Sequence, residues 1–259
     1  MDAHAERASV VLALTGAGCV AAEEEAEELL AAAGDVVALH DMVERRLTGE
    51  PLAWITGRTA FCGLDVTVEP GVYVPRWQSE PLARLAAGLL PPRGVGVDLC
   101  CGSGALAMVM QAARPGARVV ATEIDPVAVR CARRNGVVVY RGDFDSALPA
   151  ELAGEVDVMV GVLPYVPDDA LHLLPRDVQH FEPQLALEGG PGGLVPVTSV
   201  VASSPSWLRR GGWLALEVGG DQVPRVTALF EAAGYGEIDV VEDEDGDPRA
   251  VYGQLGVER

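Results

Sequence analysis

The stretch Val97-Asp98-Leu99-Cys100-Cys101-Gly102-Ser103-Gly104 decides the fold. It joins a short apolar run, VGVDLC, to a helical pattern, GALAMVMQAARP. Its glycines let the backbone turn tightly and approach a ligand, and the first turn of the following helix offers unpaired N–H groups. The G-x-G-x-x-G pattern of dinucleotide sites is not matched. Asp98 would repel a pyrophosphate but can pair with the amino group of a methionine moiety, so the stretch favours S-adenosylmethionine over NAD.

Two further strand ends carry side chains that suit the same nucleoside. Glu123 ends the next apolar run, VVATEID, about twenty residues after the glycines, where a carboxylate can bind both ribose hydroxyls. Asp143 and Phe144 follow the run GVVVY. Asp143 can accept from the adenine amino group while Phe144 packs on the ring. Each residue alone has a plainer explanation, a turn or a core aromatic, but together they predict a cofactor site.

From Gly94 onward the chain alternates strand and helix patterns. This alternation predicts a doubly wound α/β fold, in which a mostly parallel, seven-stranded sheet has helices on both faces and an antiparallel pair at its end. Residues 1–57 have helix-forming patterns that close at Gly34 and Gly49. The segment RTAFCGLDVTVEPGVYVPR that follows alternates around glycines, which predicts a hairpin or extended linker.

Composition excludes several classes of function. The net charge of −19, with nineteen arginines and no lysine, repels phosphate backbones, so we expect no direct nucleic-acid partner. No apolar run approaches the ~20 residues that span a bilayer, and no signal-peptide pattern is present, so we expect a cytoplasmic protein without a membrane partner. Five cysteines without metal-ligand spacing predict reduced thiols and no metal.

With these residues placed, the chain resembles the HemK-type (PrmC-like) protein-glutamine methyltransferases, which modify the glutamine side-chain amide in translation release factors. The resemblance runs from about residue 44 to the C-terminus. It rests on six segments, GEPLAWI (49–55), Phe61-x-Gly63, PGVYVPR (70–76) with Glu80, DLCCGSGALA (98–107), EPQLALEGGPGGL (182–194) and GGWLALEVGGDQ (211–222).

The resemblance implies a class I, Rossmann-like S-adenosylmethionine-dependent methyltransferase with a helical substrate-recognition domain at residues 1–57, a hairpin or linker at 58–78 and the methyltransferase domain at 79–259. It places residues 100–104, Glu123 and Phe144 on cofactor-contacting positions and Arg76 beside the site. The predicted cofactor-binding residues are Arg76, Asp98, Cys100, Cys101, Gly102, Ser103, Gly104, Glu123, Ile124, Asp143 and Phe144.

The chain departs from the family at the acceptor site. The family's fourth strand ends in Asn-Pro-Pro-Tyr, and this chain has Val162-Leu163-Pro164-Tyr165 there, which we take as the substrate-binding residues. Valine can neither donate nor accept, and an oriented polar group of this kind is worth ~3–4 kcal/mol in other sites. We expect Pro164 to aim backbone carbonyls inward and Tyr165 to pack against the acceptor as the catalytic residues.

A smaller departure lies in the linker, where the family's PRPETE becomes PRWQSE (75–80). His172 and His180 follow the acceptor loop and could serve as bases, although each fits a surface position better.

Three functions remain open. The leading one is methylation of a glutamine amide, or a group close to it, in a protein such as a release factor. The second is N- or O-methylation of a small molecule in secondary metabolism, because an amine, phenol or carboxylate tolerates the loss of the asparagine better than an amide does. The third is a catalytically impaired protein that binds the cofactor. DNA adenine methylation shares the Asn-Pro-Pro-Tyr motif, but the charge and the missing asparagine count against it.

Overall fold

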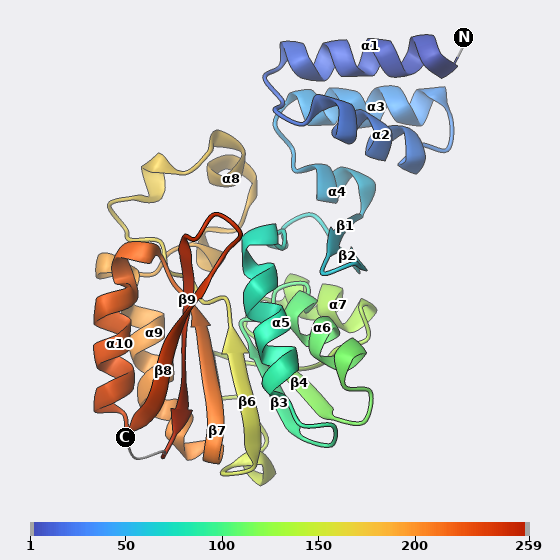
Figure 1. The fold of residues 1–259 in the computed structure, drawn as a ribbon. Coiled ribbons are helices and arrows are strands. Elements are labelled where there is room, and N and C mark those ends of the chain that lie inside the picture. The colour runs from blue at the N-terminus through green and yellow to red at the C-terminus, as the bar shows by residue number, and fades with distance from the viewer. Residues whose placement is uncertain (1–2, 257–259) are drawn as a thin grey trace.

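Seven strands form one twisted sheet in the computed structural model, which describes residues 3–256 (Figure 1). The outermost residues of the expected domains, 1–2 and 257–259, lie outside the described residues. The strands are β3 (Val95–Leu99), β4 (Arg118–Glu123), β5 (Val138–Arg141), β6 (Val156–Gly161), β7 (Leu208–Glu217), β8 (Tyr235–Glu242) and β9 (Pro248–Leu255).

The strand order is β5-β4-β3-β6-β7-β9-β8. Strands β3 to β7 pair in parallel, and β9 runs antiparallel to both of its neighbours. The sequence prediction of a doubly wound sheet with an antiparallel pair at its end is confirmed. The chain winds from β3 to one edge and then from β6 to the other, so the switch point lies between these two strands. Ligands of such sheets bind beyond the carboxyl ends of the strands at the switch point.

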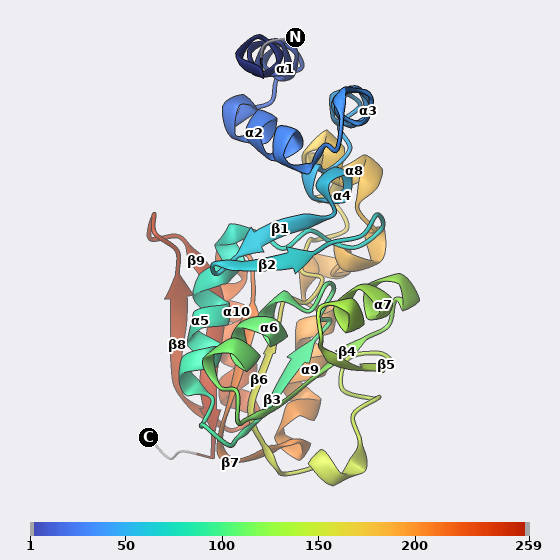
Figure 2. The same ribbon diagram turned by 90° about the vertical axis from the view of Figure 1, so that its right-hand side faces the viewer.

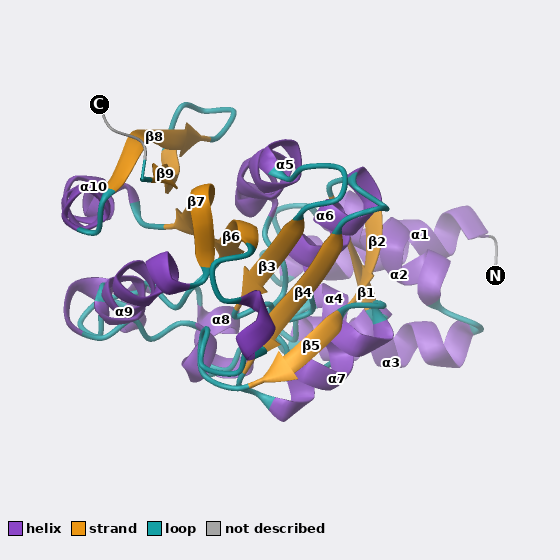
Figure 3. Cartoon of the chain, turned by 90° about the horizontal axis from the view of Figure 1, so that it is seen from below, coloured by secondary structure: helices purple, strands orange, loops and turns teal. Residues whose placement is uncertain are grey.

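Two apolar layers cover the sheet. One core cluster joins α5 (Glu80–Leu89), α6 (Ala105–Ala113) and α7 (Pro126–Arg134) to one face. A second joins α9 (Val195–Ser203) and α10 (Val223–Ala232) to the other (Figure 3). The short α8 (Arg176–Phe181) packs its Phe181 against the first of these clusters. Burial of both faces explains why the central strands are apolar along their whole length instead of alternating.

Four helices precede the sheet in the sequence, and they lie beyond the carboxyl ends of β6 and β7 (Figure 1). They are α1 (Ala3–Gly16), α2 (Ala22–Ala32), α3 (Val36–Leu47) and α4 (Leu52–Thr56), and a separate apolar cluster around Leu14, Leu29 and Ile55 holds them together. Gly49, with φ of +93°, follows the end of α3 as the sequence predicts. Helix α2 differs, because it ends in an extended Ala33 instead of a left-handed Gly34. No helix in residues 3–256 is long and apolar enough to cross a membrane.

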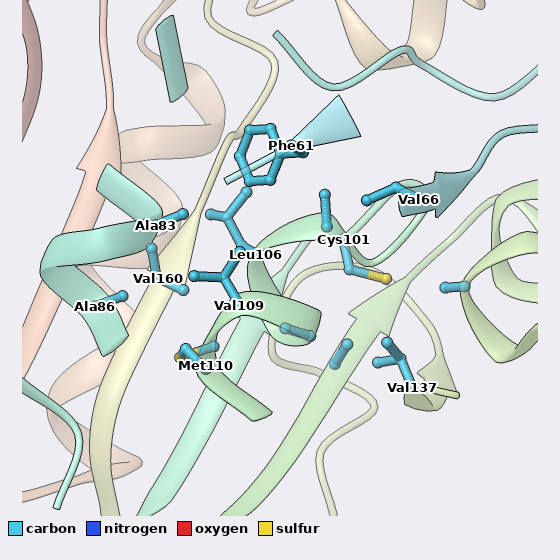
Figure 4. Close-up of a cluster of buried hydrophobic side chains, with 14 of the residues drawn as sticks. Phe61, Val66, Ala83, Ala86, Cys101, Leu106, Val109, Met110, Val137 and Val160 are labelled. Atoms are coloured by element: carbon cyan, nitrogen blue, oxygen red, sulfur yellow. The ribbon is translucent and has the colours of Figure 1, made fainter. Parts of the chain in front are cut away.

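A β-hairpin connects these helices to the sheet, as predicted. Strands β1 (Arg58–Phe61) and β2 (Leu64–Thr67) pair antiparallel around Cys62 and Gly63, which both have positive φ as a tight hairpin turn requires. Phe61 enters the core above Leu106 and Val109 of α6 (Figure 4). In Figure 2 the hairpin lies between the N-terminal helices and α6. Its apolar residues therefore fix the N-terminal part to the sheet.

Gly104, which ends the cofactor-type loop, offers a test of this packing. Its φ is +83°, and an added Cβ would lie 2.8 Å from Cγ2 of Val137. Because both the backbone strain and the overlap destabilise the folded state, we expect Gly104→Ala to lower the free energy of unfolding by about 2–4 kcal/mol in urea denaturation. Gly34→Ala is the control, since Gly34 has no left-handed φ and no neighbour within 4 Å. Equal midpoints for both variants would contradict the packing described.

Candidate cofactor and acceptor site

A cavity of about 490 Å³ opens at the carboxyl ends of β3 to β7. It brings together residues that are far apart in the sequence but follow neighbouring strands. The sequence-predicted residues on its lining are Arg76, Asp98, Cys100, Cys101, Gly102, Ser103, Glu123, Ile124, Asp143, Phe144, Val162, Leu163, Pro164 and Tyr165. Gly104 is not on this lining, because it packs against Val137 beneath the loop.

The Glu123 carboxylate is the structural centre of one end of the cavity. Its Oε2 accepts from the backbone N–H of Gly102 at 2.9 Å, and its Oε1 accepts from those of Ile124 at 2.8 Å and Asp125 at 2.9 Å. Burial raises the pKa of Glu123, and these N–H donors oppose that shift. Each carboxylate oxygen keeps further acceptor capacity, which suits the pair of ribose hydroxyls expected here.

Asp98 lies beside this group and is 1% exposed. Its Oδ2 accepts from the backbone N–H of Ala107 at 3.0 Å, at the start of α6. Burial raises the pKa of the Asp98 carboxyl to about 8. A cationic ammonium group on the ligand would stabilise the ionised form, so the side chain fits the amino group of a methionine moiety.

The loop between Asp98 and α6 is braced on two sides. The backbone N–H of Cys101 donates to the carbonyl of Thr122 at 3.1 Å. The side chain of Asn135 donates to the carbonyl of Ser103 at 2.9 Å and also binds both backbone groups of Thr67 in the hairpin. The loop is therefore held in place by β4, α7 and β2 independently of any ligand.

The surface of this loop leaves room for a ligand. Gly102 has φ of +55°, and the position that a Cβ would occupy has no heavy atom within 4 Å. The hydroxyl oxygen of Ser103 is buried without a hydrogen-bond partner in the structure. Space and an unsatisfied polar group on the same loop fit a bound nucleoside, and these residues would hold S-adenosylmethionine together with Asp98 and Glu123.

The surroundings of the two adjacent thiols disfavour the nucleophilic thiolate form. Cys100 packs toward the core on one face of the sheet and Cys101 toward that on the other. Burial raises the pKa of both thiols well above the ordinary value, and the nearby carboxylates of Asp98 and Glu123 add to the shift, so both stay protonated. No disulfide joins the cysteines, and residues 3–256 contain no cluster of side chains suited to a metal.

The part of the cavity predicted to receive the adenine is more open. Ile124 is 41% exposed, and Asp143 is exposed as well. Phe144 has a left-handed φ of +44° and packs against the core of the sheet. All three line the cavity together with Glu123, as the sequence predicts for a pocket that receives an adenosine.

The other end of the cavity is built around Tyr165. Its hydroxyl donates to Oε1 of Glu217 at 3.1 Å, and burial raises the pKa of this phenol. Its backbone carbonyl accepts from Nε2 of Gln222 at 2.9 Å. Gly193 packs so closely on that carbonyl that any side chain would overlap it. The loop predicted to bind the acceptor is therefore positioned by the turns after β7 and before α9.

Arg76 lies with this second group, although the sequence places it among the cofactor-binding residues. Its guanidinium pairs with Glu182 and lies 5.2 Å from the centre of the Tyr73 ring. Burial raises the pKa of Tyr73 to about 12, and the Arg76 charge opposes that rise. Through these contacts, Arg76 connects the linker to the segment around Glu182.

Other predicted acceptor residues differ in how they face the cavity. Val162 and Pro164 are half-buried on its lining. Leu163 also reaches the lining, but its side chain is fully buried in the core. His172 and His180 are exposed and do not line the cavity.

Sequence reasoning missed Ser79 and Glu217, which both line the cavity. Glu217 ends β7 as Glu123 ends β4, and this shared position is the signal that could have revealed it.

Comparison with known proteins adds to this geometry. The family model described as "Methyltransferase small domain" matches residues 64–142. The chain is 33% identical to the release factor glutamine methyltransferase of Geobacter sulfurreducens, over 86% of this chain and 79% of that protein. It is 37% identical to a 4-amino-L-phenylalanine/4-methylamino-L-phenylalanine methyltransferase of Streptomyces pristinaespiralis, over 85% of this chain and 84% of that protein.

Among solved structures, a methyltransferase from Pyrococcus furiosus superposes with a TM-score of 0.54 at 20% identity. The match covers 76% of this chain and 92% of that one. At this identity the likeness establishes the fold, and it agrees with the doubly wound sheet described above.

The buried carboxyl of Asp98 makes a prediction about pH and ligand binding. Its pKa is 3.8 in the unfolded chain and about 8 in the folded one, so its contribution to stability is full below pH 3.8 and is lost as the pH rises toward 8. Because asparagine does not ionise, Asp98→Asn should lose less thermal stability than the wild type across that window. We also expect its affinity for S-adenosylhomocysteine, measured by calorimetry, to fall about 10- to 100-fold.

The matched control is Asp169→Asn, which neutralises an exposed carboxylate. It should follow the wild type in both measurements. An Asp98→Asn variant with undiminished affinity would rule out the assigned contact to the ligand's amino group.

Proposed function

The chain belongs to the family of release factor glutamine methyltransferases, and from this premise we propose that it methylates the side-chain amide nitrogen of a protein glutamine. It is a methyltransferase that uses S-adenosylmethionine. The observation that carries the proposal is the continuity of one cavity from Asp98 and Glu123 to the loop that ends in Tyr165. Asp98 and Glu123 would hold the cofactor at the first end, and the loop that ends in Tyr165 would receive the acceptor at the second.

The cofactor supplies an electrophilic methyl group carried on a sulfonium. Displacement from such a centre depends mainly on the alignment of the acceptor nitrogen, which the residues at the second end provide. Tyr165 packs along the acceptor, and its position is set by Glu217 and Gln222. Pro164 limits the freedom of the loop, so that its carbonyl groups keep a constant direction.

We further propose that residues 1–57 form a part that recognises the protein substrate, that residues 58–78 link it, and that residues 79–259 form the methyltransferase domain. Support comes from contacts that hold the N-terminal helices next to the acceptor end. Trp54 of α4 packs edge-on against Phe181 of α8 at 6.3 Å between ring centres, and its Nε1 donates to the carbonyl of Val72 at 2.8 Å. A bound protein can therefore contact these helices while its glutamine enters the cavity. The reduced thiols support a cytoplasmic location.

A second candidate function is methylation of the nitrogen of a small molecule. Two observations favour it, namely Val162 in place of an asparagine and the likeness to the amino-phenylalanine methyltransferase of Streptomyces pristinaespiralis. The half-buried Val162 side chain cannot hold the plane of an amide, and a more nucleophilic amine needs that help less.

Transfer of a tritiated methyl group separates the two candidates. The purified protein is incubated with labelled S-adenosylmethionine and with a lysate of the cognate cells that has been divided into protein and metabolite fractions. Label on a glutamine of a release factor supports the leading proposal. Label confined to small amines supports the second candidate, and label in neither fraction contradicts both.

Replacement of Val162 tests the acceptor site directly. We expect Val162→Asn to raise kcat/KM on a glutamine peptide, because the amide side chain can hold the plane of the substrate amide. An oriented polar group of this kind contributes ~3–4 kcal/mol in other sites, so the increase should be at most about 100- to 1,000-fold. Val162→Leu, which adds no polar group, is the control and should not raise the rate. An unchanged rate for Val162→Asn would mean that valine does not limit this reaction.

A further inference from the structure

A buried, unpaired polar pair lies at the acceptor end of the cavity. Glu217 is 4% exposed and Ser79 is 2% exposed, and both line the cavity. Oε2 of Glu217 and Oγ of Ser79 have no hydrogen-bond partner in the structure. Buried polar atoms are rarely left unpaired, because each costs about 1–3 kcal/mol of lost solvation. The arrangement is the one expected of a subsite that a ligand completes.

The sheet register places Glu217 beside the position where the asparagine is missing. Strand β6 pairs with β7 through Val160 with Ala215 and Gly161 with Leu216. One step further, Val162 and Glu217 are neighbours, and side-chain alternation directs both toward the face of the sheet that Val160 and Ala215 share. The carboxylate of Glu217 is therefore a polar group next to the apolar Val162.

The surroundings hold this carboxylate in one orientation. The Tyr165 hydroxyl occupies Oε1 at 3.1 Å, which leaves Oε2 for a ligand. Ser79, at the start of α5, faces the carboxylate from the opposite element. Arg249 also lines the cavity, but its guanidinium pairs with Asp243 at 2.6 Å, and no ion pair to Glu217 is formed within residues 3–256. Oε2 of Glu217 thus remains an acceptor atom without an ion pair or a hydrogen bond of normal length, beside the Ser79 hydroxyl.

We propose that Glu217 and Ser79 form the acceptor-nitrogen subsite, in which Oε2 of Glu217 accepts a hydrogen bond from the N–H group of the molecule to be methylated. The inference rests on the proposed function and sharpens it, because it requires an uncharged acceptor group that carries a proton to donate to Glu217, as an amide or amine nitrogen does. An acceptor carboxylate is rejected, since it would place a second negative charge beside a buried one.

The same group takes up the proton that the reaction releases. As the nitrogen forms its bond to the methyl carbon, the carbon–sulfur bond breaks and its electron pair remains on sulfur. The nitrogen then carries one proton too many, and this proton passes to Oε2 of Glu217, which becomes a neutral carboxyl. Release of the methylated product opens the cavity to water, to which Glu217 returns the proton.

The test uses matched probes and full-length variants. The probes are N-acetyl-glutamine amide and 4-amino-L-phenylalanine, each with an oxygen counterpart, N-acetyl-glutamate amide and L-tyrosine. The variants are Glu217→Gln, which keeps an acceptor for Tyr165, and Ser79→Ala. Glu155→Gln is the control, because it makes the same chemical change at an exposed residue that directly precedes β6, at the end of the sheet away from the cavity. Calorimetry with S-adenosylhomocysteine verifies that each variant is folded and binds the cofactor product.

For whichever nitrogen probe the wild type methylates, we expect Glu217→Gln to lower kcat/KM about 10- to 100-fold and Ser79→Ala to lower it by a smaller factor. The affinity of both variants for S-adenosylhomocysteine should be unchanged. Glu155→Gln should match the wild type. Undiminished turnover by Glu217→Gln would overturn the subsite while leaving the methyltransferase function intact. Preferential methylation of the carboxylate probe, N-acetyl-glutamate amide, would also overturn it.

If no probe is turned over, that result counts against the proposed function alone, and a binding measurement then tests the subsite. Binding of the nitrogen probes to the complex with S-adenosylhomocysteine is then measured by calorimetry. Binding to the wild type that weakens at least tenfold in Glu217→Gln supports the subsite. Absence of binding to the wild type, or equal binding to both proteins, contradicts it.

Discussion

The site depends on one carboxylate that binds backbone from two strands. Glu123 accepts hydrogen bonds from Gly102 in the loop after β3 and from Ile124 and Asp125 in the loop after β4. These bonds fix the distance between the two loops and direct the remaining lone pairs of the carboxylate toward the cavity. A side chain without two acceptor oxygens cannot make all three contacts, so the geometry of the cofactor end follows from this residue.

At the predicted acceptor end, on the other side of the switch point, a glutamate at the end of a strand again binds a neighbouring loop. Glu217 at the end of β7 binds the Tyr165 hydroxyl, as Glu123 at the end of β4 binds the glycine loop. The two ends differ in what they leave free. The cofactor end is pre-braced by Asn135 and the hairpin, whereas the acceptor end keeps unpaired atoms on Ser79 and Glu217.

The sequence predicted the sheet well because its signals are local. Apolar runs followed by helical patterns define the strands, and the glycines of the first loop mark the predicted cofactor loop. Contacts between distant segments were beyond its reach. The pairing of Arg76 with Glu182 joins residues 106 positions apart, so the sequence could not show that Arg76, which it predicts to bind the cofactor, also holds Glu182. Ser79 was missed for the same reason, since its relation to Glu217 arises only when α5 packs over the end of β7, whereas the position of Glu217 at a strand end was visible in the sequence.

The measurement that tests this account most directly is a crystal structure of the full-length protein grown with S-adenosylhomocysteine. The account predicts the nucleoside in the cavity at the ends of β3 to β7, with both ribose hydroxyls within hydrogen-bond distance of the Glu123 carboxylate and the amino group facing Asp98. A nucleoside bound elsewhere, or one whose ribose does not touch Glu123, would contradict it.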